Sequence, residues 1–232
     1  MEEPAPQTAP SRILSLLFGM GFQPRRTIRW IVAERGARGT LALVLALSLI
    51  RTVVSIPRES YSAAMSAWGG WGALGVMIAL LLFVAALVVA GYFAISGLTL
   101  LSGRWLGGKA TWTSIRAALA WGLAPLYWGL LIRIPAAIFW PDAHSALNSD
   151  RAVRIGGEMV RMRGFTDASP FQVAILAGLE FLVFAWLLVI LSRSLGEVQE
   201  FSGWEGFANL VIALVLPVTA IVVVVVAAAL AF

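Results

Sequence analysis

The chain has 232 residues, of which 60% are hydrophobic and 12% are charged, with a mean hydropathy of +0.88 and a net charge of +5. A soluble domain is about 45–50% apolar and about 25% charged, so this composition excludes a soluble fold and indicates an integral membrane protein. The absence of cysteine excludes disulfides, thiolate metal sites and a cysteine nucleophile. The basic residues, nearly all arginine, are expected to report membrane topology rather than nucleic-acid binding.

Two N-terminal segments predict helices that lie in the membrane interface. After a polar, proline-rich tail, residues 12–22 (RILSLLFGMGF) are apolar but too short to span a bilayer. Residues 24–38 (PRRTIRWIVAERGAR) combine five arginines with bulky apolar residues, and Thr27 is the expected N-cap of this second helix. Residues 1–38 are therefore predicted to form a cytoplasmic tail with interfacial amphipathic helices. A loosely ordered juxtamembrane segment is the alternative.

Five apolar segments predict membrane-spanning helices in the remaining domain, 39–232. The second segment would be about 45 Å long at 1.5 Å per residue, so it should tilt, kink near Gly91 or project beyond the bilayer. Prolines inside the third and fifth segments are tolerated in membrane helices, which they usually kink. The predicted fold is an all-α integral membrane protein, a bundle of five transmembrane helices at about 40–56, 72–101, 115–140, 171–191 and 207–230.

The distribution of arginine predicts the orientation in the membrane. Six arginines precede the first span, which places the N-terminus in the cytoplasm and, after five spans, the C-terminus outside. The outer loop 141–170 alternates arginine with apolar residues in RAVRIGGEMVRMRG, so it could itself lie on the outer interface. Tryptophans are expected at both surfaces: Trp30, Trp105, Trp112 and Trp204 at the inner one, and Trp68, Trp71 and Trp140 at the outer one.

Charged residues inside the spans are candidates for a function or for a buried ion pair. Glu180 lies about 1.5 Å, Arg51 about 4.5 Å and Arg133 about 7.5 Å to the outer side of the centre of its own span. An unpaired charge at such a depth costs roughly 2.5–3.5 kcal/mol. Depth alone therefore predicts a pair between Glu180 and Arg51, with Arg133 as the rival partner. A neutral Glu180 packed alone is a third possibility, and a role in transport is the fourth.

Four basic residues are candidate contacts for anionic lipid headgroups: Arg25, Arg26, Arg29 and Lys109. The Gly107-Gly108-Lys109 sequence lacks the earlier glycine of a phosphate loop, so it is predicted to be a tight turn. His144, the only histidine, stands in PDAHSALNSD and is predicted to belong to a solvated turn rather than a metal site. No cofactor and no catalytic constellation is predicted.

Ala86, Ala90 and Ala94 repeat every four residues, so they share one face of the second span. Such a face permits close helix approach. Packing within the monomer and self-association into a homo-oligomer are the two interpretations.

The chain resembles Yip1-domain proteins in three segments: 24–31 (PRRTIRWI), 103–126 (GRWLGGKATWTSIRAALAWGLAPL) and 192–209 (SRSLGEVQEFSGWEGFAN). The matching pattern is a Pro-Arg-x-Thr opening, a Leu-Gly-Gly-Lys turn followed by Trp112, a helix carrying Ala124-Pro125, and a serine-containing turn before the last span. The resemblance implies five helices and a cytosolic N-terminus. The Asp-Leu-Tyr-Gly-Pro motif of eukaryotic members is absent, which favours a bacterial-type protein of the cell inner membrane. The eukaryotic members bind Rab-type GTPases, and the resemblance does not extend this partner to the present chain.

The sequence therefore predicts a non-enzymatic, multi-pass protein that organises the membrane or binds partner proteins or lipids. The alternative is a small transporter or channel that uses Glu180 and Arg51. An internal repeat, which many transporters have, is not evident, and five spans fit an inverted two-fold repeat badly.

Overall fold

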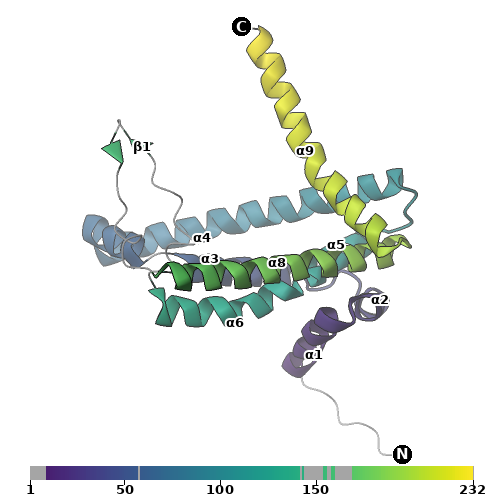
Figure 1. The fold of residues 1–232 in the computed structure, drawn as a ribbon, viewed down its shortest axis with the longest axis horizontal. Coiled ribbons are helices and arrows are strands. Elements are labelled where there is room, and N and C mark those ends of the chain that lie inside the picture. Colours follow the sequence, from purple (N-terminus) through teal and green to yellow (C-terminus); the bar gives the residue numbers. More distant parts are fainter. Residues whose placement is uncertain are drawn as a thin grey trace, which may run out of the picture. The chain divides into compact units, whose positions relative to one another are not determined.

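A computed structural model describes residues 9–56, 58–141, 143, 154–155, 158–159 and 169–231 of the chain, with side chains described from residue 13 to residue 219 except within 57–64, 142 and 144–168. Apart from one pair of two-residue strands, every described element of regular structure is a helix (Figure 1). The elements are α1 (Ala9–Phe22), α2 (Pro24–Glu34), α3 (Thr40–Ser55), α4 (Arg58–Trp105), α5 (Trp112–Gly122), α6 (Ala124–Phe139), β1 (Arg154–Ile155), β2 (Glu158–Met159), α8 (Pro170–Gln199) and α9 (Gly203–Ala231).

Three helical segments among the described residues are long and apolar enough to cross a membrane: Met65–Trp105 of α4, Trp112–Phe139 of α5 and α6 together, and Pro170–Gln199, which is α8. Of the two other predicted spans, α3 is shorter, whereas α9 has 29 residues. The α3 helix has 16 residues, and Gly203–Thr219 is the part of α9 whose side chains are described. The structure thus shows a helical membrane protein, whereas the count of five spans stays a prediction.

The α4 helix contains a kink at Gly69, whereas the sequence had offered a kink near Gly91 as one of three possibilities. Gly69 adopts φ 66° and ψ 178°, a conformation that is open to glycine but strained for residues with a Cβ. Gly91 lies within continuous helix because a single glycine does not by itself break the hydrogen-bonding pattern. From Met65 to Trp105 the apolar stretch covers 41 residues, about 60 Å at 1.5 Å per residue, which exceeds a hydrocarbon core of about 30 Å.

The third predicted span is two helices rather than one, because α5 ends at Gly122 and α6 begins at Ala124. Pro125 is the second residue of α6, where a helix needs no backbone donor. Leu123 is the C-cap residue of α5, and its N–H donates to the carbonyl of Ala120 at 3.4 Å. Pro135 lies inside α6, which continues through it to Phe139.

Contacts along the chain divide it into two compact units. Unit 1 comprises Met1–Val44, Ala90–Pro125 and Trp186–Phe232, and unit 2 comprises Leu45–Val89 and Leu126–Ala185. In unit 2, α6 packs on the first part of α8 through buried Ala136 and Leu176. The core of unit 1 contains fully buried apolar side chains: Met20, Ile28, Ile31, Ile115 and Leu195.

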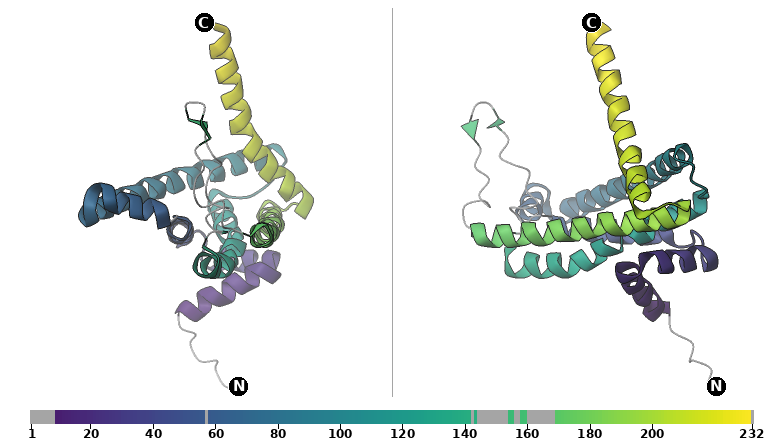
Figure 2. Two further views of the ribbon diagram at one scale, coloured as in Figure 1. Left: turned by 60° about the vertical axis from the view of Figure 1, so that its left-hand side comes forward. Right: turned by 45° about the vertical axis from the view of Figure 1, so that its right-hand side comes forward.

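Within unit 1, α1 and α2 form a helix pair that packs against α5 (Figure 2). Pro24 occupies the first turn of α2, and Gln23 is its N-cap residue without a side-chain hydrogen bond. The predicted capping by Thr27 is therefore wrong. Thr27 lies one turn inside the helix, where it contacts Gly19 of α1 so closely that a Cβ at Gly19 would lie 2.7 Å from Thr27 Oγ1.

The α9 helix contacts the rest of unit 1 near its beginning. Gly206, Asn209, Leu210 and Ala213 are buried, whereas Val215 and Val218 are exposed. In Figures 1 and 2, α9 leads away from the end of α8 toward the C-terminus. Among the described side chains of α9, up to residue 219, the buried ones therefore lie in the first turns of the helix.

Candidate functional sites

The charged residues within the spans meet in unit 2. Glu180 of α8 lies next to Arg133 of α6, with 2.6 Å between Glu180 Oε1 and Arg133 Nε. Arg51 of α3 lies at the limit of an ion pair, with 4.0 Å between its Nη2 and Glu180 Oε2. Depth alone ranked Arg51 first, but the structure places Arg133 closer. Axial depth leaves open which way each helix face points, and the packing of α6 against α8 turns Arg133 toward the carboxylate.

Arg133 is also the more enclosed of the two arginines. Its side chain is 12% exposed, compared with 35% for Arg51 and 27% for Glu180. A guanidinium nitrogen of Arg133 also donates to Ser55 Oγ at 3.3 Å. One carboxylate thus faces two guanidinium groups, and this charge cluster (Arg51, Arg133 and Glu180) carries a formal charge of +1.

Two of the four predicted lipid-contacting residues are held by carboxylates of α8 or its end. Arg29 Nη2 lies 2.6 Å from Glu197 Oε1, and Arg29 Nε donates to the same oxygen at 2.8 Å. Lys109 Nζ lies 2.7 Å from Glu200 Oε2, and the hydrogen bond and charge of Glu200 raise the pKa of Lys109. These ion pairs connect α2 and the turn after α4 to the C-terminal end of α8.

The Leu-Gly-Gly-Lys turn between α4 and α5 receives the side chain of Gln199, which is 1% exposed. A Cβ placed on Gly103 or on Gly108 would overlap the Gln199 amide group. Gly107 has φ 88°, which allows the turn between them. The Lys109 N–H donates to the Gln199 carbonyl at 3.3 Å, and Gln199 Nε2 donates to the Thr99 carbonyl at 3.4 Å. The predicted tight turn is therefore present, and Gly108 of the turn together with Gly103 of α4 makes room for a buried amide.

The end of α8 has an unusual backbone at Glu200, where φ is 63°. The Phe201 N–H donates to the Gly196 carbonyl at 2.6 Å, as in the helix-terminating motif that normally places glycine at this position. A residue with a Cβ is disfavoured there. The carboxylate that Glu200 presents to Lys109 is the interaction a glycine could not supply.

Buried polar groups also join α4 to α9. The Ser102 hydroxyl donates to Asn209 Oδ1, and both side chains are fully buried.

The α9 helix begins with a capping box, in which the Glu205 N–H donates to Ser202 Oγ at 3.2 Å and the Ser202 N–H donates to Glu205 Oε2 at 2.8 Å. Gln199 and Asn209 were not predicted, because isolated polar residues carry no sequence signal until the facing helix is known.

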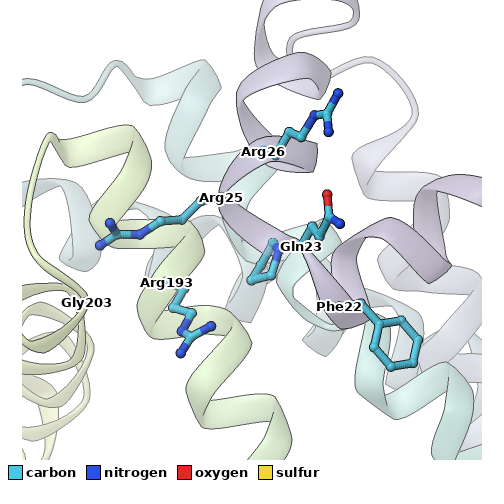
Figure 3. A pocket seen from close by; sticks show the side chains of 7 residues that line it. Phe22, Gln23, Arg25, Arg26, Arg193 and Gly203 are labelled. Carbon is cyan, nitrogen blue, oxygen red and sulfur yellow. The ribbon is translucent and has the colours of Figure 1, made fainter.

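A shallow hollow of about 510 Å³ lies between the start of α2, the end of α8 and the start of α9 (Figure 3). Arg25 and Arg26, two predicted lipid-contacting residues, line it together with Arg193 of α8. Arg25 Nη2 donates to the Phe201 carbonyl at 3.4 Å, a long and weak bond. Arg193 was not among the predicted lipid-contacting residues. We name these seven lining residues the arginine hollow: Phe22, Gln23, Pro24, Arg25, Arg26, Arg193 and Gly203.

The remaining candidates have separate outcomes. Ala86, Ala90 and Ala94 are exposed with respect to the described residues, and the choice between packing within the monomer and self-association stays open. His144 and its acidic neighbours lie outside the described residues. Within the described part of the chain, no group of three or more histidine, cysteine or acidic residues is arranged to hold a metal ion.

Comparison with known proteins identifies the family. The Yip1 domain model matches residues 18–227, which covers the chain from within α1 to near the end of α9. No curated protein and no solved structure matches the chain. The match includes all three segments that resembled the family in the sequence, together with the Gln199 turn and the arginine hollow built from them. The chain belongs to the Yip1 domain family.

Proposed function

We propose that this protein is a non-enzymatic organiser of the membrane, which binds the anionic cytoplasmic leaflet through α1 and α2. The observation that supports this most directly is the stripe formed by Leu14, Phe18 and Phe22, which are 51–74% exposed at four-residue intervals along α1. The opposite face of α1 packs into unit 1 through Leu16 and Met20. An apolar face that remains exposed beside a basic helix is typical of segments that lie in a membrane interface.

We further propose five spans with the N-terminus in the cytoplasm and the C-terminus outside, in the inner membrane of a bacterial cell. The segments that this topology places at the cytoplasmic surface are the α1–α2 pair, the turn after α4 and the turn after α8. All three belong to unit 1, where the Arg29–Glu197 and Lys109–Glu200 ion pairs join them. The inner-surface tryptophans are exposed in this unit, as interfacial residues should be: Trp30, Trp105, Trp112 and Trp204.

Single cysteines should report this orientation, because the chain has none of its own. Leu106→Cys, at the exposed turn after α4, should react with a membrane-impermeant maleimide only when the cytoplasmic face is open to the reagent. Ser169→Cys, exposed just before α8, should react in intact cells from outside. Ser102 is not a suitable site, since its side chain is buried against Asn209. Labelling of Ser169→Cys from the cytoplasm alone would reverse the proposed orientation.

The leaflet contact is tested by the depth of α1 in reconstituted vesicles. An environment-sensitive fluorophore on Leu14→Cys should be strongly quenched by lipids with brominated acyl chains, because the stripe lies among those chains. The matched control is Ala33→Cys, exposed on α2 two residues after the buried Ile31, where weak quenching is expected. Equal and weak quenching at both positions would mean that α1 does not enter the bilayer, and the leaflet-binding proposal would fail.

The transporter alternative depends on the charge cluster. Contact of Glu180 with Arg133 supports a structural role, because a carboxylate held by a neighbouring guanidinium is satisfied without a transported ion. The exposed alanines of α4 support a further proposal, namely that a second copy or a partner helix packs there.

A further inference from the structure

We propose that the arginine hollow binds the phosphate headgroup of an anionic lipid, and that it prefers a phosphomonoester such as phosphatidic acid to a phosphodiester. This inference rests on the proposed leaflet contact of α1 and α2, and it assigns that contact one defined binding site.

The charge of the arginine hollow favours an anion. Three of its seven lining residues are arginines, and none of the seven is acidic. The nearby carboxylates have other partners: Glu197 pairs with Arg29, Glu200 with Lys109, and Glu205 accepts from the Ser202 N–H. Among the described residues, Arg25, Arg26 and Arg193 form no ion pair. Their positive charge is therefore left for a ligand, unlike that of Arg29 and Lys109.

The geometry favours a phosphate group at one end of the hollow. Arg25 from α2 brings a guanidinium nitrogen to Gly203, and Arg193 from α8 passes the same glycine with its aliphatic stem: a Cβ there would lie 3.8 Å from Arg25 Nη2 and 3.8 Å from Arg193 Cγ. Figure 3 shows Arg25 extending toward Gly203, with Arg193 beside it on α8, whereas Arg26 extends away from both. We therefore assign direct contact to Arg25 and Arg193, and only a contribution to the local field to Arg26.

The preference for a phosphomonoester follows from its number of unesterified phosphate oxygens. A guanidinium group binds phosphate best through two parallel hydrogen bonds to two oxygens. A diester has two unesterified oxygens and one charge, so two arginines must share them. A monoester has three such oxygens and about −1.5 to −2 charges near neutral pH, which serves two guanidinium groups better.

The apolar stripe next to the arginines favours a lipid over a free phosphate as the ligand. Phe22 lines the hollow and is also the last member of the exposed stripe on α1. A lipid bound with its phosphate at Arg25 and Arg193 would lie where its acyl chains can follow this apolar stripe. A free phosphate gains nothing from the stripe.

The test measures lipid binding to the full chain in a neutral detergent by native mass spectrometry. Dioleoyl phosphatidic acid, dioleoyl phosphatidylglycerol and inorganic phosphate are the three probes. Arg193→Gln and Arg25→Gln should each weaken phosphatidic acid binding by about tenfold, the loss of roughly one charge-assisted hydrogen bond. Arg104→Gln is the matched control, since Arg104 is an exposed arginine of the same unit outside the hollow. It should bind phosphatidic acid like the unaltered protein.

Three results would overturn the site. Equal affinity for the two lipids would remove the monoester preference, and an equal loss in Arg104→Gln would indicate diffuse attraction instead of a pocket. Inorganic phosphate that displaces phosphatidic acid at equal concentration would show that the lipid chains contribute nothing. Because Arg25 and Arg193 lie on different helices, one variant still decides if the other does not fold. Strong quenching at Leu14→Cys together with an equal loss of lipid binding in Arg104→Gln would refute this site while leaving the leaflet contact standing.

Discussion

Replacing Arg133 with Gln should lower the free energy of unfolding by about 3 kcal/mol, since the change leaves Glu180 charged and enclosed without its closest partner. Arg51→Gln should cost less than about 1 kcal/mol, because Arg51 is more exposed and 4.0 Å from the carboxylate. The measurement is denaturation in mixed detergent micelles as the SDS fraction rises. The two arginines serve as controls for each other, since both substitutions remove one positive charge from the same cluster.

A double-mutant cycle separates the pair from its surroundings. Glu180→Gln should also destabilise the protein, and the Glu180→Gln, Arg133→Gln double variant should lose less than the sum of the single losses. Additive losses would show that the two side chains do not interact. Unchanged stability in Glu180→Gln, combined with an altered solute flux into reconstituted vesicles, would instead favour the transporter alternative. The cycle and the flux measurement together therefore distinguish a structural charge cluster from a transport site.

The second large effect is expected at the turn that receives Gln199. Gly103→Ala should destabilise the protein by about 2 kcal/mol, because the added methyl group overlaps a fully buried amide that must then move. Gly97→Ala is the matched control on the same helix. Its Cβ would lie 3.9 Å from Trp112 Cζ3, an ordinary contact, so the higher helix propensity of alanine should leave stability unchanged or raise it by up to about 1 kcal/mol.

The cause of this loss can be isolated by removing the amide. In a Gln199→Ala background, Gly103→Ala should cost less than about 0.5 kcal/mol, because the space that the amide filled is then empty. Denaturation in mixed detergent micelles with a rising SDS fraction measures this loss of stability. A full penalty in that background would place the strain in the α4 backbone rather than in the contact with Gln199, and the role assigned to Gly103 would be wrong.

The sequence predicted part of the charge cluster, because a charged residue inside an apolar segment needs a partner of opposite charge. A carboxylate in an apolar segment is costly alone, so Glu180 was expected to have a basic partner, and depth along the helix reduced the choice to two arginines. The final ranking needed the rotation of α6 about its axis, which an axial coordinate does not contain. The four basic residues predicted to contact lipid divided in the same way. Arg29 and Lys109 meet carboxylates, whereas Arg25 and Arg26 line a hollow together with Arg193, which is far away in the sequence.

Composition and hydrophobic length by themselves determined that this is a helical membrane protein, because the free energy of burying apolar residues in lipid depends on local sequence. They also located the apolar segments, although α4 begins at Arg58 rather than at residue 72 and α8 continues to Gln199 rather than to residue 191. Short local motifs indicated the Yip1 family. Only the tertiary structure decided where helices break, as at Gly69 and Leu123, and that Gln199 fills the space left by Gly103 and Gly108. These features depend on contacts between segments distant in the chain. Their energies exist only after the helices have packed.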